Sequence, residues 1–534
     1  MAGSVFKDHL FWGAFIIGSF ILSLTLWFGI GVDSATIGYC AWVWKHYGLP
    51  PYVGCIEGDY PGIFLIQRLQ MELFGEGVMG FRLFNFGLQL GALVMVFYLA
   101  RRFAESSLAG LLAVIFYALY YYQLDYYYTG EREEYVLWLI FLSLVASLVF
   151  SSRRFLRSGL VGLMVGFAFL IKPTFGLLWP LFGVWFIWEG WKRGLKSLGL
   201  ELGLFVVCCV LPALLVISYY CYLGYLWELY DVPVWMIFKA YIRKPLLYSV
   251  HPFDEVTELT QAALLRIQLR ELLTRKPVYL AGAVLAAGLE LAWPRPGEHR
   301  KILALLAALV LAGFLSIYLQ RGVWGYHQIP FWGICIILSG AGYGRLLEQI
   351  RGGRLFSIRL LPVVLLSLFL FALVIWQMPW YLRKTAYKNF RKSPERVYFL
   401  EYQDALLTAD YLKSELGEEE EYFYFGSISN VPFLAGHKLS TPFPFSEPFF
   451  WRMKDGSENP VKARWQKPYE ESVVRGKPRI FVYNTATPIA VFYPQVKDFK
   501  AKVREEMPVL QEALDNHYHL VKIYGKIEIY ERNH

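Results

Sequence analysis

The sequence predicts a polytopic α-helical membrane protein of about eleven transmembrane helices, followed by a C-terminal soluble α/β domain. Three observations lead to this fold class. Hydrophobic residues fill 56% of the 534 positions, and they gather in blocks of ~20 residues, the length that crosses ~30 Å of hydrocarbon. Short basic links join the blocks, and the blocks stop near residue 380. We therefore expect a membrane domain over 1–380 and an outer domain over 381–534.

The first apolar block, "FWGAFIIGSFILSLTLWFGIGV", carries no charge and lacks a small-residue cleavage pattern, so we expect a retained helix and not a signal peptide. Shorter blocks elsewhere require tilt or packing against other helices. The expected spans are 10–30, 82–100, 107–125, 134–151, 158–172, 175–190, 200–222, 277–293, 302–319, 328–344 and 358–380.

The basic links fall on one side of the bundle if successive spans alternate in direction. By the positive-inside rule that side is cytoplasmic, which puts the N-terminus inside and the C-terminal domain outside the plasma membrane, such as a bacterial inner membrane. The net charge of +9 does not indicate nucleic-acid binding, because the basic residues lie in these separate links. The links are 100–103, 151–158, 191–197, 294–301 and 344–359.

The large outer loop, residues 31–81, is too apolar to lie free in water. Its segments "ATIGYCAWVWKHYG" and "PGIFLIQRLQMELFG" have helical periodicity and predict two amphipathic helices on the membrane surface, covering a cavity. Asp33 begins this loop, and Glu57 and Asp59 lie near its middle. Asp33 has two interpretations: it is the N-cap of a juxtamembrane helix, or it is a general base kept at membrane depth despite the cost of an ionisable group there.

Cationic residues fall in the other outer loops. Each has a structural alternative: Arg132 in "GEREEY" can pair with its neighbouring glutamates, Lys172 can reach the interface by snorkelling, and His327 can be purely structural. Several cations beside several acids at one depth instead suit an anionic headgroup next to a hydroxyl that must lose its proton. The tyrosines of 117–135 form an interfacial belt or line a sugar pocket. The polar group comprises Asp33, Glu57, Asp59, Glu131, Arg132, Glu133, Lys172, Arg321 and His327.

The six cysteines show no metal-binding spacing. Cys208 and Cys209 lie within an apolar run and are expected to be small core residues. Cys40 and Cys55 share the outer loop, where an oxidising compartment would allow a disulfide. The sequence leaves both the paired and the reduced state open.

The C-terminal region alternates helix and strand signals. "ALLTADYLKSELG" (405–417) predicts a helix, "EYFYFGS" (421–427) and "RIFVYNT" (479–485) predict buried strands, and 519–532 predicts a hairpin. This pattern is typical of a small α/β domain. It shows no catalytic constellation, so we assign it to acceptor binding or support.

The chain has no Walker glycine loop, H-E-x-x-H, C-x-x-C or G-x-S-x-G motif. It resembles instead the GT-C membrane glycosyltransferases, especially the protein-mannosyltransferase-like family 39 and its aminoarabinose-transferase relatives. The C-terminal region, including "YFYFGSISNVPFLAGHKLSTPF", also resembles their outer α/β domain. The motifs that carry the resemblance are Gly31-Val32-Asp33-Ser34-Ala35 after the first span, Asp59-Tyr60-Pro61-Gly62, "GEREEY", "GFAFLIKPTFGLLWP" (166–180) and "GYHQIP" (325–330).

This resemblance implies a sugar donor linked to a polyprenyl phosphate, used on the outer face for transfer to a hydroxyl acceptor. By position, Asp33 would be the catalytic base, and Glu57, Asp59 and Glu131 would contact sugar or acceptor. Arg132, Lys172 and His327 would bind the lipid phosphate. Many relatives have a lysine before the proline of the first loop, where this chain has Tyr60. That phosphate contact is therefore either missing or supplied from elsewhere, by Arg82 or Arg321. A metal site is not evident, although carboxylates suit Mg²⁺ or Mn²⁺.

Two alternatives remain at this stage. An oligosaccharide ligase or polymerase using a lipid-linked glycan would differ only in the size of the donor cavity. A polytopic transporter predicts midplane charges and paired broken helices, whereas the charges here lie at one face and no paired broken spans are evident.

Overall fold

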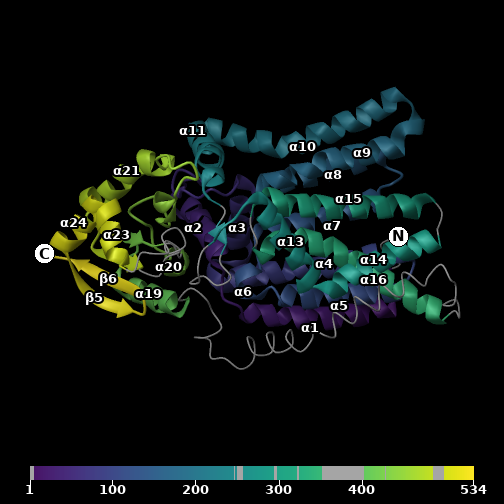
Figure 1. The fold of residues 1–534 in the computed structure, drawn as a ribbon, viewed down its shortest axis with the longest axis horizontal. Helices are drawn as coiled ribbons and strands as arrows, with labels where there is room; N and C mark the ends of the chain where they lie inside the picture. The colour runs from purple at the N-terminus through teal and green to yellow at the C-terminus, as the bar shows by residue number, and fades with distance from the viewer. Residues whose placement is uncertain are drawn as a thin grey trace. The chain divides into compact units, whose positions relative to one another are not determined.

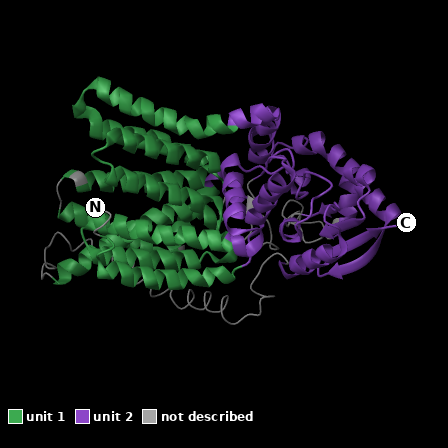
Figure 2. Ribbon diagram, turned by 180° about the vertical axis from the view of Figure 1, so that it is seen from behind, with its two compact units in different colours: residues 1–28, 82–216, 263–391 green, residues 29–81, 217–262, 392–534 purple. Residues whose placement is uncertain are grey.

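The computed structural model describes residues 5–245, 247–248, 257–293, 297–321, 324–351, 402–426, 429–484 and 498–533. The chain divides into two compact units (Figure 2). Unit 1 comprises 1–28, 82–216 and 263–391, and unit 2 comprises 29–81, 217–262 and 392–534. The predicted span 358–380 and the predicted domain boundary at 381 lie outside the described residues.

Unit 1 is helical (Figure 1), and every predicted span within the described residues coincides with a helix. By length and composition, six helices of the described residues qualify as membrane spans, and α13 and α14 meet at a bend of 83°. The expected count of eleven remains a prediction. The helices are α1 (His9–Ser23), η2 (Leu24–Trp27), α4 (Gly77–Ala104), α5 (Ser107–Tyr122), α6 (Asp125–Tyr128), α7 (Arg132–Val149), α8 (Arg154–Ile171), η3 (Pro173–Leu177), α9 (Leu178–Gly190), η4 (Trp191–Arg193), α10 (Leu195–Leu223), α13 (Gln261–Arg275), α14 (Pro277–Ala292), α15 (Gly297–Leu319), η7 (Gly325–Gln328) and α16 (Ile329–Arg351).

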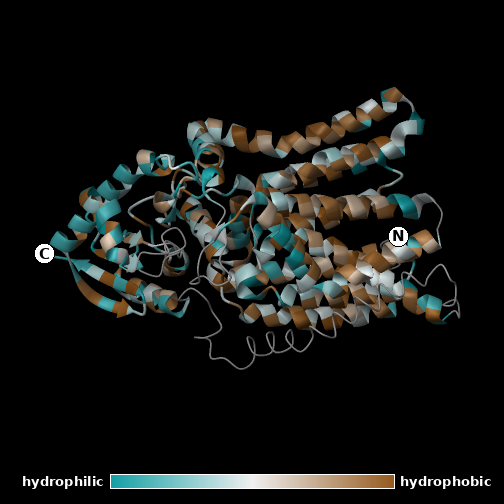
Figure 3. Ribbon diagram, viewed as in Figure 1, coloured by the Kyte–Doolittle hydropathy of each residue, from teal (hydrophilic) through white to brown (hydrophobic). Residues whose placement is uncertain are grey.

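Helix α16 is the buried centre of unit 1, and small residues bring its neighbours close. A Cβ on Gly340 would lie 2.5 Å from Cβ of Ala113 in α5, and one on Gly344 would lie 2.6 Å from Cα of Ala109. Such small-residue faces allow helices to pack by close van der Waals contact within a membrane. Helix α10 is the opposite case: only 17% of its most apolar window is buried, and it shows hydrophobic residues along much of its length (Figure 3).

Ion pairs tie several basic links together at the ends of these helices. Arg101 lies 3.5 Å from Asp8 near the N-terminus, and Nε2 of His299 lies 3.1 Å from Glu105. Arg157 near the start of α8 lies 3.0 Å from Glu201 in α10. The links 100–103 and 294–301 therefore share an end with the N-terminus, in agreement with the predicted topology.

Unit 2 contains the α/β part of the chain. Its main sheet has the strand order β3-β4-β6-β5, in which β3 and β4 are parallel and the other pairs antiparallel. The predicted strands and the hairpin are confirmed, as is the helix at 405–417. The elements are β3 (Phe423–Phe425), β4 (Ile480–Asn484), β5 (Tyr518–Tyr524), β6 (Ile527–Arg532), α19 (Tyr402–Glu415), α20 (Asn430–Ala435), η9 (Glu447–Phe450), α21 (Pro460–Gly476), α23 (Phe499–Glu506) and α24 (Pro508–His517).

The rest of unit 2 comes from the 31–81 loop and the segment after α10. Both amphipathic helices predicted in the loop are present as α2 (Val32–Tyr47) and α3 (Pro61–Phe74). Cys40 and Cys55 form a disulfide, with Cα atoms 5.1 Å apart, which settles the choice that the sequence leaves open. The later elements are α11 (Leu226–Tyr230), η5 (Asp231–Met236), α12 (Ile237–Lys239), η6 (Tyr241–Arg243), β1 (Leu247–Tyr248) and β2 (Thr257–Glu258).

Candidate functional site

The "TGERE" turn before α7 begins the candidate site in unit 1. Gly130 has φ +86°, a left-handed conformation that glycine adopts at little cost. Glu131 is the N-cap of α7, and Arg132 is its first residue. The carboxylates in the first turn of α7, Glu133 and Glu134, lie where the helix dipole favours negative charge.

Glu134 fixes this turn from inside the bundle, a role that the sequence analysis misses. Its carboxylate accepts the Gly130 N–H at 2.7 Å, the Tyr121 hydroxyl at 3.1 Å and the Gln89 amide at 2.5 Å. The Tyr117 hydroxyl in turn donates to Gln89 at 2.6 Å. Only 2% of Glu134 is exposed, so each of these hydrogen bonds offsets a large desolvation cost. The turn is therefore held in one geometry.

Arg82 holds the same turn from helix α4. Its guanidinium is buried and donates to the Thr129 hydroxyl at 2.7 Å and to the Tyr126 carbonyl at 3.1 Å. The apolar helix α4 carries polar residues at helical spacing, namely Arg82, Asn85 and Gln89. This periodicity is the sequence signal that predicts a polar face directed into the bundle. The structure thus places Arg82, the suggested phosphate ligand, against the backbone of the site.

Lys172 enters the site from the end of α8. The next residue is Pro173, which disfavours helix at Lys172 and leaves it extended, with φ −153° and ψ 110°. The Lys172 ammonium forms an ion pair with Oε1 of Glu133, and Nε2 of His327 lies 3.8 Å from the same oxygen. Glu133 is fully buried, and its Oε2 has no hydrogen-bond partner among the described residues.

Tyr326 provides an aromatic wall between two of the cations. Cζ of Arg132 lies 5.6 Å from its ring centroid, and Nζ of Lys172 lies 5.7 Å from it, which is within cation–π range. The ring also contacts Tyr128 at a centroid separation of 5.6 Å. A Cβ on Gly325 would lie 3.2 Å from Tyr128, so η7 packs closely against the tyrosines. The "GEREEY", "GFAFLIKP" and "GYHQIP" segments thus meet in one cluster.

Two predicted residues of unit 1 remain, Glu131 and Arg321, and Glu131 contacts this cluster through Arg132. Glu131 is 1% exposed, and its Oε2 lies 3.6 Å from Nη2 of Arg132. Arg321 follows α15 with a left-handed backbone, φ +56°. Its backbone N–H donates to the carbonyl of Tyr318 at 3.1 Å.

The predicted acids of the 31–81 loop belong to unit 2. Asp33 lies in the first turn of α2, whose N-cap is Gly31, so the N-cap interpretation of Asp33 is wrong. Its carboxylate nevertheless lies at the favourable end of the helix dipole. Glu57 and Asp59 lie between the disulfide and α3, and all three carboxylates are partly exposed. The backbone carbonyl of Asp59 accepts the Tyr52 hydroxyl at 2.6 Å.

The C-terminal region holds the helix that carries Asp33. The Asn430 amide donates to the Ile30 carbonyl at 3.0 Å, and the Ile30 N–H donates to the Tyr402 hydroxyl at 3.3 Å. The Leu439 N–H donates to the hydroxyl of Tyr39, in α2, at 2.8 Å. Because these bonds are buried, the C-terminal region determines where α2 begins.

No group of three histidine, cysteine, aspartate or glutamate side chains among the described residues is placed to hold a metal ion. What the cluster of unit 1 offers is cationic side chains from α7, α8 and η7 around one aromatic face. Buried charges of this kind act on an anionic ligand in a medium of low effective dielectric, where their attraction is stronger than in water.

The fold is that of the GT-C membrane glycosyltransferases. ArnT from Cupriavidus metallidurans, solved with undecaprenyl phosphate, superposes with a TM-score of 0.54 at 14% identity, covering 98% of this chain and 97% of that one. The Archaeoglobus fulgidus oligosaccharyltransferase, solved with a tethered acceptor peptide, gives 0.51 at 12% identity, covering 99% and 75%.

A family model matches part of the chain. Residues 59–216 match the family model of the dolichyl-phosphate-mannose-protein mannosyltransferases. The matched segment includes the "GEREEY" turn and Lys172. A search of curated proteins finds no match. The resemblance stated from the motifs is thus confirmed.

Proposed function

We propose that this protein is an inverting glycosyltransferase that moves a sugar from a polyprenyl-phosphate-linked donor to a hydroxyl acceptor on the outer face of the membrane. The observation that carries the proposal is the convergence of Arg132, Lys172 and His327 around Glu133 and Tyr326. Three separated segments build one cationic cluster within a fold shared with enzymes solved with lipid phosphates.

The cations would bind the phosphate that leaves. A lipid phosphate departs as a stable anion, since its second pKa is only ~6. It requires charge stabilisation and no general acid, unlike the sugar alkoxide that glycosidases must protonate. Arg132 and Lys172 supply fixed positive charge, and His327 adds to it when protonated. Arg321 and Arg82 complete the proposed phosphate group, Arg82 by holding the turn.

Asp33 would be the base that takes the proton of the acceptor hydroxyl. Glu57, Asp59 and Glu131 would contact the sugar or the acceptor. The hydroxyl oxygen attacks the anomeric carbon, the bond to the phosphate oxygen breaks, and the proton passes to Asp33. A single displacement of this kind inverts the anomeric configuration. Nucleotide sugars are cytoplasmic, so an external site requires a donor delivered by a lipid.

The test uses the full-length protein in nanodiscs with polyprenyl phosphates carrying single hexoses or pentoses. We expect wild-type protein to release free polyprenyl phosphate in the presence of an acceptor extract, and Asp33→Asn to lower turnover by ~10²–10⁴-fold. Asp231→Asn is the matched control: it removes a carboxylate of unit 2 that pairs with Arg464 at the exposed surface. Parallel reactions with EDTA test whether Mg²⁺ or Mn²⁺ takes part.

Normal turnover of folded Asp33→Asn would remove Asp33 from the mechanism. Release of lipid only from donors carrying whole glycans would replace the proposal by the ligase reaction. Uptake of a solute into proteoliposomes of the same protein, without sugar transfer, would replace it by transport. Mass spectrometry of membrane glycolipids and glycoproteins, with and without the gene, would then identify the acceptor.

A further inference from the structure

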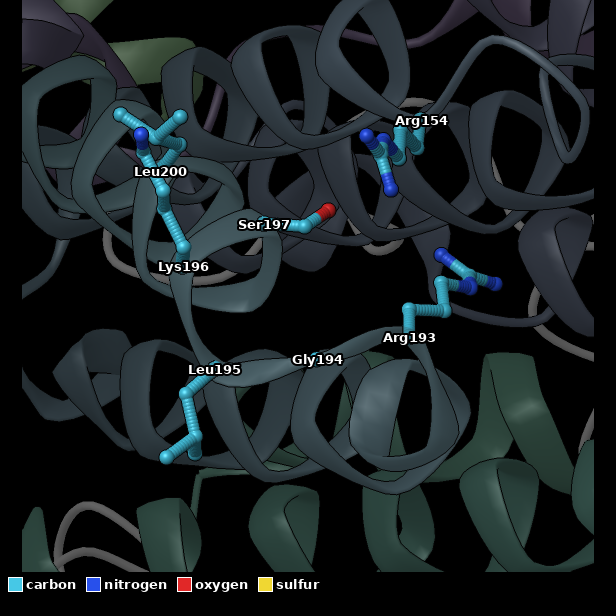
Figure 4. Close-up of a pocket in the computed structure, with 7 residues that line it drawn as sticks. All are labelled: Arg154, Arg193, Gly194, Leu195, Lys196, Ser197 and Leu200. Carbon is cyan, nitrogen blue, oxygen red and sulfur yellow. The ribbon is translucent and has the colours of Figure 1, made fainter.

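A second cationic site lies at the other end of α8 from the candidate active site. Arg154 begins α8, and its pocket is completed by the connection from η4 into α10 (Figure 4). The pocket is open to the surface and has a volume of about 400 Å³. Its lining residues are Arg154, Arg193, Gly194, Leu195, Lys196, Ser197 and Leu200. Since α8 has 18 residues, the two sites are separated by roughly 27 Å of helix.

The lining of this pocket contains three basic residues and a hydroxyl and no carboxylate. Arg154 makes no hydrogen bond or ion pair with any described residue, and its guanidinium contacts the face of Phe155 at 4.7 Å. The Ser197 hydroxyl is buried and has no hydrogen-bond partner among the described residues. Figure 4 shows this hydroxyl pointing to the side of the pocket where Arg154 and Arg193 lie. Arg193 keeps one long contact, 3.5 Å, with Glu201.

The backbone adds to this preference for an anion. Gly194 adopts φ +88° and turns the chain into α10. The first-turn N–H groups of a helix lack partners within the helix, and those of α10 lie in the wall of the pocket. The helix dipole and the arginine charges therefore both favour binding of an anion.

Apolar surface beside the cations distinguishes a lipid from a free anion. Leu195 is 84% exposed and Leu200 60% exposed, both within the pocket wall, and Trp191 next to it is 71% exposed. Further along α10, Leu211, Leu214 and Leu215 are also exposed, and the helix is hydrophobic over much of its length (Figure 3). A phospholipid whose phosphate is held in the pocket would thus have apolar protein surface against which its acyl chains can lie.

We propose that this pocket binds the phosphate headgroup of an anionic phospholipid, in the leaflet at the start of α8. The positive-inside rule predicts that this end is cytoplasmic, because the basic links 151–158 and 191–197 lie there. Anionic lipids are concentrated in cytoplasmic leaflets, and basic pockets between transmembrane helices are suited to them. The proposal does not depend on the glycosyltransferase function, because it concerns the opposite end of the helices.

Lipid retention in native mass spectrometry tests the site. Full-length protein is exchanged into micelles containing phosphatidylglycerol, or phosphatidylcholine with the same acyl chains. We expect retention of phosphatidylglycerol only, and a loss of about fivefold in affinity for each charge removed in Arg154→Gln/Lys196→Gln. Arg154→Lys keeps the charge but loses the planar fork that binds phosphate through two hydrogen bonds, so it should also weaken retention. Ser197→Ala removes the buried hydroxyl and should weaken it further.

Arg300→Gln/Arg351→Gln is the matched control, because it removes two exposed arginines from other basic links. Equal losses of phosphatidylglycerol affinity in the two double variants would show that diffuse surface charge causes the retention, and would overturn the proposal. So would equal retention of both lipids, or binding of inorganic phosphate at Arg154 without retention of phosphatidylglycerol. Each readout is independent of sugar transfer, so failure here leaves the proposed function unaffected.

Discussion

Two buried ion networks occupy opposite ends of α8, and they differ in how completely their charges are enclosed. At the start of the helix, Arg157 is 1% exposed and is shared by Glu189 and Glu201, the latter also 1% exposed. This closed network holds its buried cation between two carboxylates, and of the three side chains only Glu189, 20% exposed, reaches solvent. It ties α8, α9 and α10 together.

At the end of the helix the proportions are reversed. Glu133 is fully buried, but the cations around it remain accessible: 14% of the Lys172 side chain and 12% of that of Arg132 are exposed. Glu133 here contacts two side chains, Lys172 and His327, while Arg132 lies beside Glu131. A site prepared for an anionic ligand therefore combines a buried carboxylate with accessible cations. An ion pair that stabilises helix packing has a buried cation instead.

The largest expected effect tests the closed network. Arg157→Leu removes the buried cation shared by Glu189 and Glu201 and leaves Glu201 only its long contact with Arg193. It should lower the free energy of unfolding by about 3–5 kcal/mol, measured by unfolding in mixed SDS micelles. Turnover per folded molecule should not change. Arg157→Leu/Glu189→Gln/Glu201→Gln removes the unpaired charges and should recover most of the stability. Loss of turnover in that folded triple variant would contradict the assignment of the network to stability.

The next effect tests the accessible network. Lys172→Met should lower turnover by ~10²–10³-fold, the usual loss when one stabiliser of developing negative charge is removed. Because this change leaves Glu133 buried without its partner, Lys172→Met/Glu133→Gln serves as the control that restores charge balance. The double variant should fold normally and remain inactive in release of polyprenyl phosphate. Recovery of transfer in the double variant would show that Lys172 serves only to neutralise Glu133.

A third prediction extends the comparison to unit 2, where a covalent bond takes the place of an ion pair. Cys40→Ser/Cys55→Ser removes a disulfide between residues with a sequence separation of 15. It should lower the free energy of unfolding by ~3 kcal/mol, mainly because the unfolded chain gains conformational entropy. Protease sensitivity of the 31–81 loop measures the effect, with Cys221→Ser as the control. Unchanged stability in the double variant would mean that the C-terminal contacts alone hold α2.

The smallest effect is expected at the exposed pair of the C-terminal region. The hydrogen bond from the Arg479 guanidinium lowers the pKa of Glu420 below its usual value. A lowered folded-state pKa contributes stability above the unfolded value of about 4.3, and this stability is lost as the pH falls through the folded pKa. Arg479→Met should lower the free energy of unfolding by ~0.2–1 kcal/mol at pH 7. It should also reduce the change in thermal unfolding temperature between pH 7 and pH 3. Equal pH dependence in both proteins would contradict the pairing.

The sequence allowed much of the helical framework and some of the site residues to be predicted. Uncharged blocks predicted the helices because backbone groups in hydrocarbon must be paired internally. Lys172 and His327 were found by short motifs. Glu133 was named as a member of the outer polar group, but Glu134 was not singled out, because nothing local distinguishes a glutamate that faces solvent from one that accepts hydrogen bonds from Tyr121 and Gln89.

Hydropathy and the positions of charges, which depend on local chain chemistry, by themselves determined that this chain builds membrane-length helices and a terminal α/β region. Only the tertiary structure decided that Glu133 contacts both Lys172 and His327. Lys172 is 39 positions away in the sequence, and His327 is further still. It also decided that Arg82 supports the site backbone and that Cys40 pairs with Cys55. The physical reason is that such pairings depend on which helix faces meet, and a helix's own periodicity specifies its apolar face without specifying its neighbour.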